Sequence, residues 1–243
     1  TAGAVLGLEL VNPRPSVCAT FLRGARGPMP GVHRHRGRLA PGDVGRCGCV
    51  LVTSPARTAL DIGHELGPDA AITAADSALR RNLTTRVALD AAIRSSRNWP
   101  GIAAAHRSLE LADGCAESAL ESMSRLRLAD AGLPPPRPQV PILARGGQFI
   151  GRVDFYWDEF GVVGEADGDG KLAGRPRGLI EEKRRQGQLE DAGLIVVRWG
   201  WSDLRTFDPV AAHLRAAFDR GMRPNRAPRL WRPAPWPQAS AAS

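Results

Sequence analysis

The chain has 243 residues, of which 43% are apolar and 24% charged, close to the average for globular proteins. A largely disordered chain and a disulfide-stapled miniprotein do not fit this length and composition. Its 33 basic and 25 acidic residues give a formal net charge of +8, which favours a polyanionic partner, with nucleic acid as the first candidate.

The far end of the chain carries much of this positive charge. Residues 222–243 hold four arginines, many prolines and no acidic residue. We therefore predict a disordered tail over 222–243 and a folded body that is only mildly basic. No segment reaches the ~18–20 apolar residues that span a bilayer, and no export signal is recognisable, so we expect a soluble cytoplasmic protein without membrane contacts.

Short strands are predicted for the first part of the chain, at 17–22, 31–36 and 49–52. In the second of these, the period of two places His33 and His35 on one face and the neighbouring arginines on the other. The arginine face is either an exposed strand surface or a strip that contacts nucleic acid.

The four cysteines show no metal-site spacing. Cys47 and Cys49 are separated by one residue and have no nearby His or Cys partners, so we expect buried free thiols rather than a zinc site.

A helical region follows. Ser54 as N-cap and Pro55 at the first helical position predict a helix to about Leu66. Alanine-rich amphipathic helices are expected next, at 69–81, 85–97 and 101–111. Residues 1–112 thus form a predicted strand-and-helix domain.

The pattern changes after a helix at 116–131 and a proline-rich connector. Strands and helices then alternate, which predicts an α/β (α+β) domain over 113–221. Strands are expected at 139–144, 148–157, 161–167 and 194–199, and helices at 176–192 and 208–220.

The second and third of these strands form a predicted antiparallel hairpin with a turn at 158–161. If residues 158 and 161 pair, opposite residue numbers sum to 319, which places Asp154 across from Glu165 and Arg152 across from Asp167. A glycine bulge at Gly161 is the alternative; it shifts the sum to 320 and turns Asp154 to the other face.

Directly opposed side chains have Cβ atoms ~4.5–5.5 Å apart, and two carboxylates at such positions disfavour strand pairing unless a positive charge lies between them. Mg²⁺ or Mn²⁺ would supply it, since carboxylates are its usual protein ligands. The alternatives are that Asp154 pairs with an arginine such as Arg152 and that 167–170 is an ordinary loop. An EF-hand loop starting at Asp167 is excluded because Gly178 occupies the twelfth position.

The segments FIGRVDFYW, VVGEADGDGK and EEKRRQGQLEDAGLIVVRW, after a helix with Glu117 and Glu121 and the run AGLPPP, resemble a known domain. It is the very-short-patch-repair-endonuclease-like domain of many actinobacterial hypothetical proteins, a branch of the PD-(D/E)XK nuclease superfamily. The resemblance covers about 115–205. It implies a restriction-endonuclease-like mixed sheet flanked by helices and Mg²⁺-dependent hydrolysis of phosphodiester bonds in DNA.

The resemblance also implies residue roles. Asp154 matches the first metal-binding aspartate and Glu165 the second carboxylate. Asp167 stands where the superfamily most often has lysine, so the charge-stabilising lysine would be Lys171 or, as a weaker match, Lys183. Glu121, or Glu117 on the same helix face, resembles a glutamate that supports the metal in relatives.

The downstream helix departs from the family, because Gln186 or Gly187 stands where a charged residue is usual. Arginines around the site are candidates for contacts with DNA phosphates, with a solvated helix face as the alternative. They are Arg152, Arg175, Arg177, Arg184 and Arg185.

The earlier segments VHRHRGRLAPGD and VTSPARTALDIG resemble the C-terminal part of AbiEi-type antitoxins of type IV toxin–antitoxin systems, over roughly 1–112. In that family a winged helix comes first, which we expect to be absent here or cut off. This likeness implies a cognate toxin as partner, and it makes a non-catalytic DNA-binding antitoxin or transcriptional regulator the alternative to an endonuclease.

Overall fold

The computed structural model describes residues 1–243 except 22–28, 37, 145, 169–175, 223–230 and 234–243. It divides into two compact units, Thr1–Leu126 and Arg127–Ser243. The division falls within helix α6 (Ala119–Asp130), whereas the sequence predicts a boundary at residues 112 and 113. Each unit is described by itself.

The first unit begins with short α1 and two pairs of strands. The elements are α1 (Ala2–Val5), β1 (Val17–Phe21), β2 (Val32–Arg36), η1 (Pro41–Asp43), β3 (Val44–Cys47) and β4 (Val50–Thr53). β1 and β2 run parallel, while β3 and β4 form an antiparallel hairpin. The three strands predicted by the sequence are confirmed; β3 is additional.

Four helices follow in this unit before α6: α2 (Pro55–Leu66), α3 (Pro68–Arg80), α4 (Arg86–Ser95) and α5 (Ala103–Leu111). Pro55 starts α2 as predicted, and Gly67, at φ 93°, turns the chain directly into α3. Small side chains let these helices approach closely. A Cβ added at Gly63 would lie 2.6 Å from the Cβ of Ala71 and 2.9 Å from that of Ala105.

A five-stranded mixed sheet forms the centre of the second unit, in the order β8-β7-β6-β5-β9. Its strands are β5 (Arg137–Ala144), β6 (Phe149–Trp157), β7 (Val162–Ala166), β8 (Ile195–Trp199) and β9 (Trp231–Pro233). β7 and β8 run parallel, and the other neighbours are antiparallel. The strands and helices predicted for 139–220 are confirmed, and the short η2 (Asp203–Arg205) adds to them.

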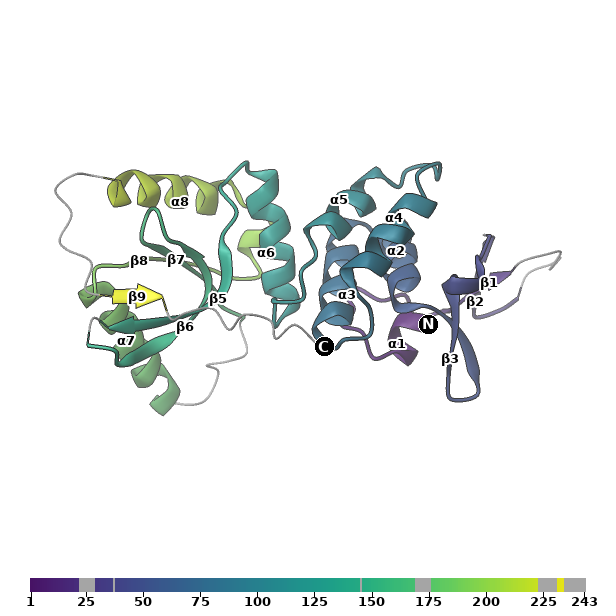
Figure 1. Ribbon diagram of the computed structural model, residues 1–243, viewed down its shortest axis with the longest axis horizontal. Coiled ribbons are helices and arrows are strands. Elements are labelled where there is room, and N and C mark those ends of the chain that lie inside the picture. The colour runs from purple at the N-terminus through teal and green to yellow at the C-terminus, as the bar shows by residue number, and fades with distance from the viewer. Residues whose placement is uncertain (22–28, 37, 145, 169–175, 223–230, 234–243) are drawn as a thin grey trace. The chain divides into compact units, whose positions relative to one another are not determined.

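Helices α7 (Pro176–Asp191) and α8 (Asp208–Gly221) cover opposite faces of this sheet (Figure 1). On the α7 face, Tyr156 and Val163 pack in one core cluster with Leu189. On the α8 face, the rings of Trp157 and Phe218 meet edge to face at 5.3 Å. Both faces of the sheet are therefore partly apolar. Any polar side chain on the α7 face lies next to the apolar cluster of Tyr156, Val163 and Leu189.

The tail departs from the sequence prediction in one place. Disorder is predicted throughout 222–243, but Trp231–Pro233 form β9, which pairs antiparallel with residues 142–144 of β5. Without β9, strand β5 would be the edge of the sheet and leave backbone groups unpaired, and Trp231 is a residue type that favours strands. The prediction is wrong for these three residues; 223–230 and 234–243 lie outside the described part.

The whole chain belongs to the mixed α/β class, as the sequence predicts. Among the described residues, no helix has both the length and the apolar character needed to cross a bilayer.

Candidate functional site

The β6–β7 register decides which charged residues meet. Phe155 pairs with Gly164, Tyr156 with Val163 and Trp157 with Val162, so the residue numbers sum to 319. The predicted register is confirmed, and the alternative with a sum of 320 is wrong. Since opposite residues share a face, Asp154 and Glu165 both belong to the α7 face.

The backbone ladder ends at Phe155 and Gly164, and the side chain of Asp154 continues it. The Ala166 backbone N–H donates to Asp154 Oδ2 at 2.9 Å, and Gln139 Nε2 donates to Oδ1 at 3.2 Å. Gln139, with φ of 52°, lies on the neighbouring strand β5. The side chain of Asp154 thus bonds to both flanking strands, and its partner on β7, Ala166, is the residue after Glu165.

Glu165 is a buried carboxylate, 4% exposed, held by a bidentate ion pair. Arg185 Nη1 donates to Oε1 at 3.1 Å, and Nη2 donates to Oε2 at 2.8 Å. Burial raises the pKa of Glu165 above its usual value; the hydrogen bonds and charge of Arg185, with the charge of Arg198, offset only part of this rise. The ionised carboxylate is therefore incompletely compensated.

Asp167 lies just past the end of β7 with a partly exposed side chain. Arg198 Nη1 donates to its Oδ2 at 3.2 Å, and Asp167 N donates to the Trp199 carbonyl at 2.9 Å. Arg198 comes from β8, where it sits beside Glu165 in the parallel ladder. The predicted opposition of Asp167 and Arg152 lies beyond the described β6–β7 ladder.

The predicted DNA-contacting arginines differ in their surroundings. Arg185 is bound to Glu165, and its Nη1 also approaches the Arg152 carbonyl oxygen at 3.3 Å. Arg152 and Arg184 are exposed. Three further predicted residues lie partly or wholly outside the described residues: Lys171 and Arg175 entirely, and Arg177 by its side chain, although its backbone belongs to α7.

Glu121 belongs to the first unit and makes local contacts at the start of α6. Its Oε1 accepts from the Ser118 hydroxyl at 2.8 Å, and its Oε2 accepts from the Glu117 backbone N–H at 2.9 Å. Glu121 N in turn donates to Ser118 Oγ at 3.3 Å. These bonds resemble a helix capping box, so the contacts assign Glu121 a structural role, and its predicted metal-supporting role stays a prediction.

The sequence does not predict two residues of the site, Gln139 and Arg198. The alternation Val196-Val197-Arg198 places Arg198 on the same face as Val196, a signal available from the sequence. Its neighbour was not predictable, because the parallel pairing of β7 with β8 depends on a crossover through α7.

Comparison with known proteins finds two similar chains. Both are from strains of Mycobacterium tuberculosis and are named "Uncharacterized protein MT2308" and "Uncharacterized protein Rv2248". Each is 36% identical over 172 residues, which cover 70% of this chain and 62% of the relative, so the match spans less than two thirds of these relatives. No family profile and no solved structure matches.

Proposed function

We propose that the second unit is a restriction-endonuclease-like domain that hydrolyses phosphodiester bonds in DNA with the help of Mg²⁺. The observation that carries the proposal is the β6–β7 register, which puts Asp154 and Glu165 on one face of neighbouring strands. The side chain of Asp154 reaches the backbone N–H of Ala166, directly beside Glu165.

The residues at this face fit a divalent cation. Carboxylate oxygens are the preferred protein ligands of Mg²⁺, and Asp154 and Glu165 offer them from adjacent strands. The pKa of Glu165 stays raised by burial despite its Arg185 partner, so a further positive charge would stabilise the ionised form. When bound, the cation polarises a phosphate oxygen and lowers the pKa of a coordinated water.

The chain's own cations complete the proposed site. Arg185 forms an ion pair with the buried Glu165, and Arg198 forms one with Asp167 at the end of β7. Arg152 and Arg184 are exposed and would contact backbone phosphates, which positions DNA without reading its sequence. Lys171 remains the proposed residue for offsetting charge on the reacting phosphate.

An exposed aromatic residue close to Asp167, Trp201, suggests how the site would hold a DNA base. Trp199 is 3% exposed and stacks on Phe155, so it packs in the core. Trp201, two residues further on, is instead 39% exposed. Its Nε1 would lie 3.7 Å from a Cβ at Gly168, next to Asp167, and we propose that this exposed ring stacks on a base of bound DNA.

The second candidate is a non-catalytic DNA-binding regulator of the antitoxin type. The bidentate pair between Glu165 and Arg185 favours it, because both oxygens of one of the two proposed metal ligands already accept hydrogen bonds from an arginine. A cognate toxin as its partner rests on the sequence resemblance of residues 1–112.

Plasmid nicking separates the two candidates. For the endonuclease we expect Mg²⁺-dependent conversion of supercoiled to open-circular DNA, abolished in Asp154→Ala. Glu159→Ala removes an exposed carboxylate from the turn of the same hairpin and serves as the matched control with full activity. DNA binding that is salt-sensitive and unchanged in Asp154→Ala, without any nicking, would support the regulator instead.

A further inference from the structure

A thiol, an imidazole and a carboxylate meet in the first unit, on residues that the proposed nuclease site does not use. In the parallel β1–β2 ladder Cys18 lies beside His33, and Thr20 lies beside His35. The period of two therefore places Cys18 on the same face as both histidines, whose shared face the sequence predicts. Glu65, in the last turn of α2, faces them.

The three groups are close enough to share one ligand. The Cys18 Sγ, a ring nitrogen of His35 and a carboxylate oxygen of Glu65 lie within 4.8 Å of one another. Bonds of ~2.0–2.3 Å in a tetrahedral zinc site imply roughly 3.3–3.8 Å between ligand atoms, so small side-chain rotations suffice. All three residues are half-buried.

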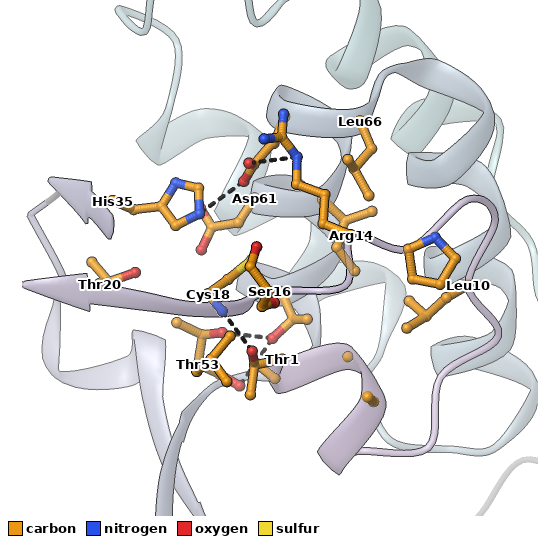
Figure 2. A pocket seen from close by; sticks show the side chains of 18 of the residues that line it. Thr1, Leu10, Arg14, Ser16, Cys18, Thr20, His35, Thr53, Asp61 and Leu66 are labelled. Atoms are coloured by element: carbon orange, nitrogen blue, oxygen red, sulfur yellow. Dashed lines mark hydrogen bonds and ion pairs between the residues drawn. The ribbon is translucent and has the colours of Figure 1, made fainter. Parts of the chain in front are cut away.

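Glu65 collects positively charged or protonatable groups. Its Oε2 lies 2.8 Å from His35 Nε2, and its Oε1 lies 2.9 Å from His33 Nε2 and 3.1 Å from Arg14 Nε. In Figure 2 the dashed lines from Arg14 and His35 run to the same carboxylate.

One oxygen of this carboxylate has two ion-pair partners but accepts no hydrogen bond of good geometry from them. Glu65 Oε1 is buried, and among the described residues no donor meets it with hydrogen-bond geometry, although two nitrogens lie close by. A buried oxygen without a hydrogen bond is costly, and coordination to a cation would satisfy it.

We propose that Cys18, His35 and Glu65 bind a zinc-class transition-metal ion. Sulfur, imidazole nitrogen and carboxylate oxygen together suit Zn²⁺ and disfavour Mg²⁺, which takes oxygen ligands. Arg14 acts as a positioning residue that orients the Glu65 carboxylate. Binding releases the thiol proton of Cys18, because the thiolate is the ligand.

The site also has access and a structural purpose. Cys18, His35 and Glu65 line a cavity of about 300 Å³ beside α1 and α2, through which an ion can enter (Figure 2). The β1–β2 pair is a sheet of only two strands, which is marginal on its own. A metal ion would fasten it to α2 and so stabilise the folded first unit.

Cobalt spectroscopy on the intact chain tests this proposal. After chelator treatment we expect one equivalent of Co²⁺ to produce a thiolate-to-cobalt charge-transfer band and tetrahedral d–d bands, which Zn²⁺ then abolishes. The charge-transfer band requires sulfur, so Co²⁺ bound by Asp154 and Glu165 does not contribute to it. Cys18→Ser should lose the band, and Cys49→Ser, at an exposed cysteine of the same unit, should keep it.

A second readout does not depend on the folding of a variant. In the wild-type chain, Zn²⁺ should slow alkylation of Cys18 at least about tenfold while leaving exposed Cys49 reactive, as measured by mass spectrometry. An ion-pair cluster without metal affinity predicts no charge-transfer band and equal alkylation rates with and without Zn²⁺. Either of these results would overturn the proposal.

Discussion

At the scale of single residues, burial of the Glu165 carboxylate has a clear effect on its pKa and therefore on the pH dependence of stability. Burial raises the pKa of this carboxyl above 4.5, and Arg185 offsets only part of the effect. The folded state therefore binds the proton more tightly than the unfolded state, so this group's contribution to stability falls as pH rises above about 4.5.

This linkage gives a pH prediction. The free energy of unfolding of the wild type should decrease, relative to that of Glu165→Gln, as pH is raised from about 4 to 7, because the substituted side chain no longer titrates. Urea denaturation at several pH values measures both curves. Glu159→Gln, at an exposed turn position, should run parallel to the wild type. A constant difference between wild type and Glu165→Gln over this range would contradict the argument.

Gly164 illustrates how a small residue positions the site. It precedes Glu165 on β7, and a Cβ added to it would lie 2.5 Å from Trp199 Cη2 and 3.1 Å from Trp157 Cζ3. Close approach of these buried indole rings fixes β7 in the sheet, so the space left by the glycine determines where Glu165 can sit.

Substitution at this position should therefore be costly. Gly164→Ala is expected to destabilise the protein by about 1–3 kcal/mol through overpacking. Gly45→Ala is the control, since nothing lies within 4 Å of its added Cβ on β3. Thermal denaturation of both variants checks the prediction, which fails if they unfold at the same temperature.

At the scale of elements, the sequence predicts helix ends and hairpins well, but it does not predict which distant strands pair. Pro55, Gly67 and Gly132 mark the ends of helices, and each helix boundary in 54–131 lies close to its prediction. The β6–β7 register was predictable because its turn is short and local. The parallel pairing that brings in Arg198 and the pairing of β9 with β5 join distant segments, for which periodicity carries no information.

In the candidate site, too, the contacts within one hairpin were predictable from the sequence and the contacts between distant segments were not. Asp154 and Glu165 were placed on one face from the hairpin alone, whereas the partnership of Glu165 with Arg185 depends on how α7 packs on the sheet. The grouping of Cys18, His35 and Glu65 was likewise hidden, because its ligands come from three elements and match no compact spacing rule.

Helix packing in the first unit supplies a prediction at this scale. Gly63 lets α2 touch Ala71 of α3 and Ala105 of α5, and both neighbouring Cβ atoms are fixed to helix backbones. Gly63→Ala should therefore destabilise the chain by about 1–3 kcal/mol, despite the gain in helix propensity.

The control glycine lies in α7, where an added Cβ meets nothing within 4 Å. Gly187→Ala should stabilise the protein by up to about 1 kcal/mol, since alanine favours the helix. Opposite signs for the two substitutions in urea denaturation are the expected result. A stabilising Gly63→Ala would mean that α2 can move away from its neighbours at little cost.

At the scale of the whole molecule, positive charge should govern the affinity for DNA. Arg152 and Arg184 are exposed on the unit that carries the proposed site. If each neutralises one phosphate, its replacement by alanine should reduce the magnitude of the slope of log K against log salt by about 0.9.

Fluorescence anisotropy with labelled duplex DNA at several salt concentrations measures this slope. Arg220→Ala removes an exposed charge from the last turn of α8, on the opposite side of the sheet, and should leave the slope unchanged. Equal losses for all three variants would indicate attraction by net charge alone.

The central claim is that Asp154 and Glu165 share a divalent cation, and calorimetry with Mg²⁺ tests it most directly. Mg²⁺ suits this test because it disfavours sulfur and nitrogen ligands, so the cluster around Cys18 contributes little heat. We predict one Mg²⁺ bound by the intact wild-type chain, with affinity at least about tenfold weaker in Glu165→Gln. Identical heats for the two proteins, or no heat for either, would contradict the account.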